Sequence, residues 1–116
     1  KLFGFKCMLD GRTLTFYGDV TFKPELSDIV KDSDYVMHEA FCLESEENIF
    51  HAYEKHHSTV KHACEMMNDL NVRNLILYHT EESHGLERKR MYEDEGKRYF
   101  NGNVIVPDDM EEIIIK

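Results

Sequence analysis

The 116-residue chain has no tryptophan, two prolines, three cysteines and no apolar run longer than a few residues. Apolar runs this short exclude a transmembrane helix, which needs about 20 apolar residues. No apolar core follows Lys1, so we expect no signal peptide. The cysteines, Cys7, Cys42 and Cys64, are odd in number and widely spaced. We therefore expect reduced thiols in a cytoplasmic protein.

Several familiar catalytic and metal-binding motifs are also missing. The sequence contains no His-Glu-x-x-His, no His-x-His and no Cys-x-x-Cys motif, although it has seven histidines. It has no glycine-rich phosphate loop and no Gly-x-Ser-x-Gly nucleophile elbow. Any site must therefore be assembled from residues that are far apart in the sequence.

Positive charge is scarce, with 14 Lys and Arg against 23 Asp and Glu, a net charge of −9. This balance argues against a nucleic-acid backbone as a free-standing target and against an anionic membrane surface. The chain is 41% hydrophobic, 11% aromatic and 32% charged, which is typical of a soluble globular protein and not of a disordered one. Its length allows one small domain over residues 1–116.

Apolar patterning predicts strands that alternate with helices after a leading hairpin. The Asp10-Gly11 pair is a strong hairpin turn signal. A helix that begins at Ser58 or Thr59 has an apolar stripe on one side. We expect strands over 2–8, 13–17, 35–38 and 74–78, helices over 24–30, 44–55, 59–70 and 86–100, and short apolar segments at 104–106 and 113–115. The fold class is therefore α/β.

Three of the predicted strands end in polar residues: Asp19, Glu39 and His79. Ligands of layered α/β folds bind where the strands run out at their carboxyl ends, so these side chains could converge. Asp and His are ligand types for Zn or Mn. His57 begins a helical segment and could shuttle protons if a carboxylate orients it.

Each of these residues also has an ordinary structural interpretation. Asp19 after a glycine is typical of a turn, Glu39 could face solvent or accept a backbone hydrogen bond, and His57 could belong to a capping segment. The histidines at 51, 56, 62 and 84 show no ligand spacing. The charged run 81–98 indicates a solvated helix face, with a phosphate site at 88–90 as the alternative. Cys42 and Cys64 are expected to be buried core thiols.

The order of four segments, FYGDV, YVMHEAF, HHSTVKHA and NLILYHT, resembles the C-terminal half of the metallo-β-lactamase superfamily, in its ribonuclease Z-like branch. Intervals of 20, 18 and 22 residues separate Asp19, Glu39, His57 and His79, which is family-like spacing. The resemblance implies half of an αββα sandwich, with a mixed sheet and helices on one face. The start at Lys1 without Met then fits a boundary between halves, with the N-terminal half absent from the chain.

The resemblance also implies a reaction and roles for residues. Asp19 matches an aspartate that bridges two metal ions, usually Zn2+ with Mn2+ possible, and His79 matches a histidine of the second metal. Glu39 and His57 match a pair beside the leaving group. A hydroxide formed on the metals would attack phosphorus, and His57, oriented by Glu39, would donate a proton to the leaving oxygen. The resemblance thus implies a dizinc phosphodiesterase.

Departures from the family pattern keep other hypotheses open. The main metal motif, His-x-His-x-Asp-His, is absent, so two ligands are too few for a closed site. Residues 81–85 differ from the family's Ser-x-Arg-Tyr-like segment, so RNA is an uncertain substrate beside a smaller phosphodiester or related ester. The expected partner is the missing N-terminal half. The alternatives are a non-catalytic interaction or homodimerisation module, and a complete metal protein that uses the many histidines.

Overall fold

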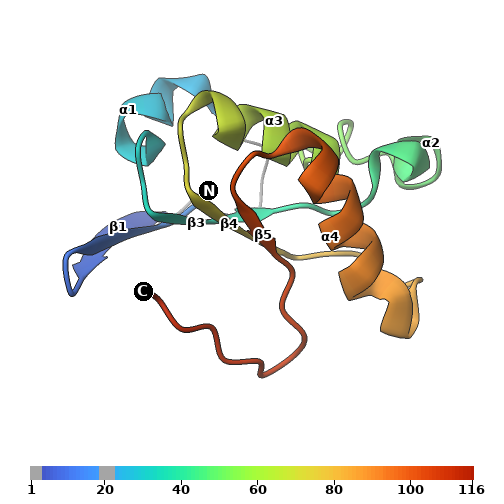
Figure 1. Ribbon diagram of the computed structural model, residues 1–116. Helices are drawn as coiled ribbons and strands as arrows, with labels where there is room; N and C mark the ends of the chain where they lie inside the picture. The colour runs from blue at the N-terminus through green and yellow to red at the C-terminus, as the bar shows by residue number, and fades with distance from the viewer. Residues whose placement is uncertain (1–3, 19–22) are drawn as a thin grey trace.

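The computed structural model describes residues 4–18 and 23–116, whose strands form one five-stranded sheet in the order β1-β2-β3-β4-β5. The β1–β2 pair is antiparallel and the remaining pairs are parallel, so the sheet is mixed. Figure 1 shows this order of elements. The strands are β1 (Phe5–Leu9), β2 (Arg12–Phe16), β3 (Tyr35–Glu39), β4 (Asn74–Tyr78) and β5 (Asn103–Ile105). The predicted α/β class is confirmed.

The turn between β1 and β2 lies where the sequence predicted it. Asp10 has φ 49° and Gly11 has φ 78°, and positive φ at both central residues is the type I′ geometry that matches strand twist. Leu9 pairs with Arg12 across this turn. The turn therefore fixes the register of the hairpin.

Helices lie on one face of the sheet (Figure 1). The core consists of Val36, Leu75 and Leu77 from the sheet, packed with Met67 of α3 and Tyr92 of α4. Thr59 caps α3, since its Oγ1 accepts a hydrogen bond of 3.2 Å from the N–H of His62. The helical segments are η1 (Pro24–Leu26), α1 (Ser27–Val30), η2 (Glu44–Glu46), α2 (Glu47–Phe50), α3 (Val60–Asp69), η3 (Gly85–Glu87) and α4 (Arg88–Tyr99).

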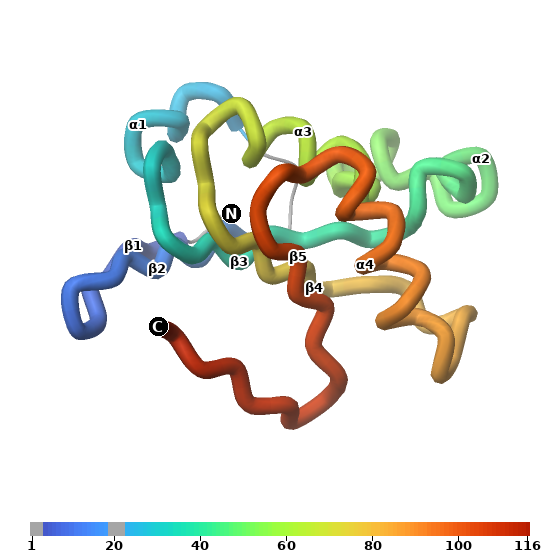
Figure 2. Tube along the Cα trace, viewed as in Figure 1, coloured from blue at the N-terminus to red at the C-terminus, as the bar shows by residue number. Residues whose placement is uncertain are grey.

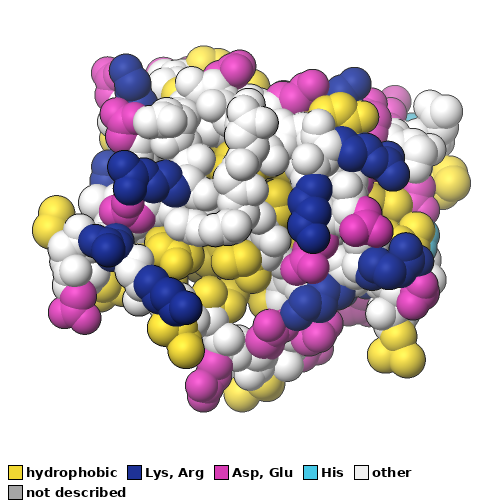
Figure 3. All heavy atoms as spheres, in the orientation of Figure 1, with side chains coloured by type: hydrophobic (Ala, Val, Ile, Leu, Met, Phe, Trp, Pro, Cys, Tyr) yellow, Lys and Arg dark blue, Asp and Glu magenta, His cyan; other side chains and the backbone are white. Residues whose placement is uncertain are grey.

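Within residues 4–18 and 23–116, no helix lies on the opposite face of the sheet. Strand alternation places Phe16, Met37 and Ile105 on this face, and each is only half-buried. The extended C-terminal segment passes on this side in Figures 1 and 2, where the N–H of Lys116 donates to the hydroxyl of Tyr35 at 3.4 Å. Figure 3 shows hydrophobic side chains gathered at the centre of the same view, framed by charged ones. Helices on one face only match the predicted half-sandwich.

Two sequence-based predictions about the helical segments are wrong. The helix expected over 44–55 ends at Phe50, because His51 adopts a left-handed conformation with φ 52° that terminates α2. The run 81–98 is not simply a solvated face, since Glu81 and Glu95 are buried. Charge alone did not reveal the burial of these two carboxylates.

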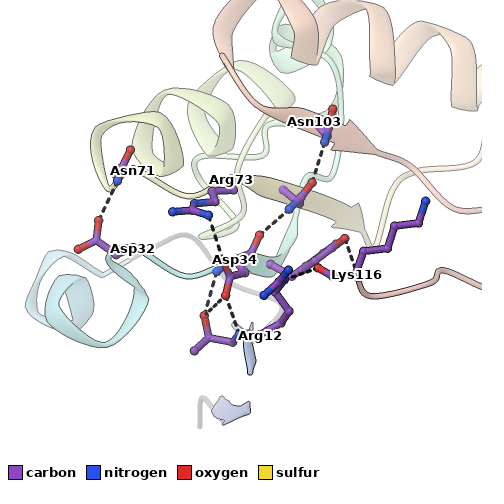
Figure 4. Close-up of polar contacts among 10 residues, drawn as sticks. Arg12, Asp32, Asp34, Asn71, Arg73, Asn103 and Lys116 are labelled. Carbon is purple, nitrogen blue, oxygen red and sulfur yellow. Dashed lines mark hydrogen bonds and ion pairs between the residues drawn. The ribbon is translucent and has the colours of Figure 1, made fainter. Parts of the chain in front are cut away.

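The amino ends of the strands are joined by a chain of polar contacts (Figure 4). The carboxylate of Asp34 accepts hydrogen bonds from the backbone N–H of Thr13 at 2.9 Å and from its hydroxyl at 3.3 Å. The amide of Asn74 donates to the carbonyl of Asp34 at 2.8 Å, and the amide of Asn103 donates to Asn74 Oδ1 at 2.8 Å. The Thr13 N–H holds the pKa of Asp34 below its ordinary value. These contacts tie β2, β3, β4 and β5 together at one edge.

All three cysteines are free thiols, and Cys42 and Cys64 are buried as expected. Burial raises the pKa of both buried thiols to about 12, so they stay protonated and behave as small apolar side chains. No helix within residues 4–18 and 23–116 is both long and apolar enough to cross a membrane.

Candidate metal and acid–base site

Three of the four residues singled out from the sequence meet at the carboxyl edge of the sheet. Glu39 ends β3, His79 follows β4, and His57 lies in the loop before α3. One ligand atom from each side chain lies within 4.8 Å of the others. Because β3 and β4 are parallel neighbours, with Glu39 opposite Tyr78, their carboxyl ends bring these residues together.

Glu39 and His57 form a carboxylate–imidazole pair. Glu39 is fully buried, and its Oε1 accepts a hydrogen bond of 2.5 Å from the backbone N–H of Ser58. Its Oε2 lies 3.4 Å from Nδ1 of His57, whose side chain is 20% exposed. Burial on one side and a backbone donor on the other fix the carboxylate, so it can orient an imidazole that solvent still reaches.

His79 follows the last residue of β4 and is exposed. Its φ of 59° lies in the left-handed region, which costs a residue with a Cβ roughly 1–2 kcal/mol. This backbone turn places the imidazole ring 5.2 Å from the ring of His57, centroid to centroid. A residue held in such a conformation at a strand end is typical of a functional site.

Phe41 is a part of the site that the sequence analysis missed. Its ring stacks on His57 at 5.5 Å with an interplanar angle of 24°, and lies 6.1 Å from the ring of His79. It therefore forms an apolar wall against both histidines. Its only signal in the sequence is its position two residues after Glu39, in the segment that follows β3.

Asp19, the fourth predicted site residue, lies outside the described residues. The chain just before it is described: the N–H of Tyr17 donates to the carbonyl of Met37 at 2.9 Å. The ring of Tyr17 stacks on His38 at 5.2 Å, and burial lowers the pKa of His38 to about 4, so this imidazole is neutral. Tyr17 thus extends the pairing of β2 with β3 beyond Phe16, toward the carboxyl end of β3 where Glu39 lies.

The donor set suits a transition-metal ion. Glu39, His57 and His79 offer a carboxylate oxygen and imidazole nitrogens, the donors that Zn2+ and Mn2+ accept. The residues present therefore fit a metal ion as well as a proton-transfer pair.

A second cluster, Glu46, Glu81 and His84, also brings three possible ligand atoms within 4.8 Å. His84 Nε2 lies 2.8 Å from Glu46 and 3.5 Å from Glu81, and the hydrogen bond that it donates to Glu46 raises the pKa of His84. The contacts of one imidazole with two carboxylates account for this geometry without a metal ion. The sequence shows no ligand spacing around His84 because its partner Glu46 lies 38 residues away.

The basic segment at 88–90 has internal partners. Arg88 donates to the hydroxyl of Thr80 at 3.1 Å and to the carbonyl of Pro107 at 2.7 Å, and Lys89 donates to Glu111 at 2.6 Å. These contacts favour a structural role for Arg88 and Lys89 over the phosphate site considered from the sequence. Arg88 also borders a groove of about 630 Å3 that opens beside His79. The groove is lined by Tyr78, His79, Thr80, Glu82, Gly85, Arg88, Pro107, Asp108, Asp109 and Met110.

Known proteins with similar sequences are ribonucleases Z. The ribonuclease Z of Ligilactobacillus salivarius is 30% identical over 98 residues, which cover 84% of this chain and 30% of that protein. The Bacillus cereus ribonuclease Z is 30% identical over 99 residues, covering 84% of this chain and 31% of that protein. The chain thus spans about a third of the length of these curated relatives. No family model matches the chain.

Solved structures agree on the fold. The short form of human tRNase Z superposes with a TM-score of 0.67 at 18% identity, covering 97% of this chain and 38% of that protein. The metallo-β-lactamase fold protein YhfI from Bacillus subtilis gives a TM-score of 0.67 at 16% identity over 92% of this chain and 46% of that one. A long-form RNase Z from yeast is 30% identical, with a TM-score of 0.53 over 60% of this chain. This chain is therefore similar in sequence to ribonucleases Z over most of its own length and has the fold of metallo-β-lactamase proteins.

Proposed function

We propose that this chain is the C-terminal half of a metal-dependent phosphodiesterase, with residues 1–116 forming one domain. The observation that carries the proposal is the convergence of Glu39, His57 and His79 at one edge of the sheet, with ligand atoms within 4.8 Å of one another. Similarity to ribonucleases Z supports hydrolysis of a phosphodiester as the reaction. RNA and smaller diesters are both substrates of this chemical class.

His57 is the proposed general acid. Glu39 orients the imidazole through the 3.4 Å contact, and the N–H of Ser58 holds Glu39 in place at 2.5 Å. When the bond between phosphorus and the leaving oxygen breaks, His57 donates a proton to that oxygen. The paired carboxylate stabilises the protonated imidazole before this transfer.

His79 and Asp19 are the ligands that we propose this chain contributes to the metal site. We propose zinc as the metal, with manganese as the alternative, because imidazole and carboxylate donors suit both. When bound, the metal supplies a hydroxide nucleophile near neutral pH by acidifying a bound water. The further ligands would come from the N-terminal half.

The helix-free face of the sheet is the proposed contact surface for that half. Phe16, Met37 and Ile105 leave apolar area half-exposed there, and a sheet face of this kind normally packs against another layer. The alternative is that this face pairs with a second copy of the chain and forms a homodimer. Light scattering of the purified chain separates the two: a monomer that binds the N-terminal half supports the first.

The test of the proposed function is reconstitution. The chain is produced together with its N-terminal half, and hydrolysis of bis(4-nitrophenyl) phosphate is measured before and after removal of metal with a chelator. We expect turnover that the chelator abolishes and that added zinc or manganese restores. Turnover that survives complete removal of metal, or no turnover with any divalent metal, would contradict the proposal.

A further inference from the structure

The backbone of Phe41 is held from three sides, and each bond comes from a different part of the sequence. Its N–H donates to the carbonyl of Ser58 at 2.8 Å. Its carbonyl accepts one hydrogen bond from the N–H of Glu81 at 2.7 Å and another from the hydroxyl of Tyr92 at 3.0 Å. The residue whose ring forms the wall of the site is therefore fixed by the loop before α3, the loop after β4 and the helix α4.

Tyr92 is the most distant of these contacts, 51 residues from Phe41. Its side chain is fully buried in the core between the sheet and α4, and burial raises the pKa of the phenol, so it remains protonated. The hydroxyl also lies 3.4 Å from Oε2 of Glu81. A buried hydroxyl needs a partner, and of the two acceptors that this hydroxyl faces, the carbonyl of Phe41 is the nearer.

Glu81 is held in turn, so the contacts to Phe41 have little freedom to shift. Its Oε1 accepts a hydrogen bond of 2.8 Å from the N–H of Ser83, and its Oε2 lies 3.5 Å from the imidazole of His84. Through the 2.8 Å contact between His84 and Glu46, this network reaches η2. Several elements therefore hold the single carbonyl of Phe41.

We propose that Tyr92 is a positioning residue for the site: by holding the carbonyl of Phe41, it keeps the Phe41 ring against His57 and His79. The consequence for catalysis rests on the proposed function. The ring contacts restrict where the two imidazoles can turn, and a displacement of about 1 Å at a reacting group can cost on the order of a hundredfold in rate. Tyr92 touches neither histidine, so its effect passes through Phe41.

The test compares Tyr92→Phe with Tyr99→Phe in the protein that contains both halves. Tyr99 lies in the same helix, and its ring centroid is 5.4 Å from Nζ of Lys61. It makes none of the hydrogen bonds that hold the backbone of Phe41. We expect Tyr92→Phe to lower kcat about tenfold to a hundredfold with little change in KM, and Tyr99→Phe to change neither. An equal effect of the two variants, or none from Tyr92→Phe, would overturn the proposal.

A second readout does not depend on activity. In the metal-free protein, nuclear Overhauser contacts between the Phe41 ring and the His57 imidazole should weaken in Tyr92→Phe and persist in Tyr99→Phe. Loss of these contacts in a protein that hydrolyses no diester would leave the positioning role intact and remove the proposed function. Unchanged contacts in an active enzyme would do the reverse.

Phe41→Leu guards against a Tyr92 variant that folds poorly. It removes the aromatic wall and keeps an apolar side chain, so kcat should fall by a similar factor. The double variant should then be no slower than Phe41→Leu alone, because both changes remove one contact. Full kcat in Phe41→Leu, or additive losses in the double variant, would overturn the proposal.

Discussion

The two ends of the same parallel strands use polar residues in opposite ways. At the amino ends, the carboxylate of Asp34 is matched by its neighbours, with the N–H of Thr13 at 2.9 Å and the guanidinium of Arg73 at 3.7 Å. At the carboxyl ends, Glu39 and His57 lie 3.4 Å apart, and a second imidazole, from His79, comes within reach of both. One end joins strands to each other, and the other gathers donors around one point.

The contrast separates stability from chemistry. The hydrogen bonds at the amino ends of the strands add about 1 kcal/mol each to the free energy of unfolding. Donors from three segments that converge on one point can bind a third group there. Substitutions at the amino ends of the strands should therefore change stability, whereas substitutions at the carboxyl ends should change turnover or metal affinity.

The largest expected effect is on turnover. His57→Ala in the protein with both halves should lower kcat by about 10²–10⁴-fold, the usual contribution of a general acid. Its matched control is His56→Asn, since His56 is exposed and Asn tolerates the left-handed φ of 62° at that position. Hydrolysis rates of a dinucleoside phosphate, whose alkoxide leaving oxygen needs a proton, give the comparison. If the control loses as much activity as His57→Ala, His57 has no special role.

Next in size is the change in metal affinity. His79→Ala should weaken zinc binding by more than the roughly 10–100-fold that loss of an outer partner of a metal ligand costs. His57→Ala should weaken it less, because His57 is assigned to proton transfer. Competition with a chromogenic chelator measures both constants. The reverse order would make His57 the ligand and His79 the outer residue.

A smaller effect, on stability alone, is expected at the amino ends. Asp34→Ala removes the acceptor of two hydrogen bonds from Thr13. The free energy of unfolding should fall by about 1–3 kcal/mol, with kcat unchanged in the folded protein. Asp69→Ala, at an exposed position in α3, is the control and should fall by less than about 0.5 kcal/mol. Urea titrations measure both, and a drop in kcat for folded Asp34→Ala would break the separation between the two ends.

The smallest expected effect is a change in acid sensitivity. The Thr13 N–H lowers the pKa of Asp34 below 3.8, so the stabilisation is fully present above that value and is lost as the pH falls through the lowered pKa. Asp34→Asn should therefore show a shallower loss of stability below pH 3.8 than the parent chain. Unfolding midpoints across this acidic range provide the measurement, and parallel curves would exclude the contribution.

Local signals predicted most of the fold. The Asp10-Gly11 turn, the NLILY strand and the Thr59 cap each depend on residues next to one another, and each is found as expected. The early end of α2 was missed because the left-handed conformation of His51 has no distinctive sequence signal. The pattern of charge likewise gave no sign that Glu95 is buried.

The site was predictable only in part. Glu39 and His79 could be placed at one edge because each ends or follows a parallel strand. His57 was a proton-transfer candidate from its place at a helix start, and the resemblance paired it with Glu39. The Phe41–Tyr92 contact and the Glu46–His84 pair could not be predicted, since they span 51 and 38 residues of sequence. Asp19 stays a prediction. Sequence patterns within one segment predict its own secondary structure, whereas its contacts with distant segments depend on how the whole chain packs.

The left-handed φ of 59° at His79 sets a trade-off between folding and function. Glycine adopts this conformation without steric cost, so His79→Gly would relieve roughly 1 kcal/mol of strain. The variant would thus gain thermal stability as it loses an imidazole at the candidate metal site. Selection for stability alone would therefore favour glycine at this position, so retention of histidine in heat-adapted variants would support a functional role for His79.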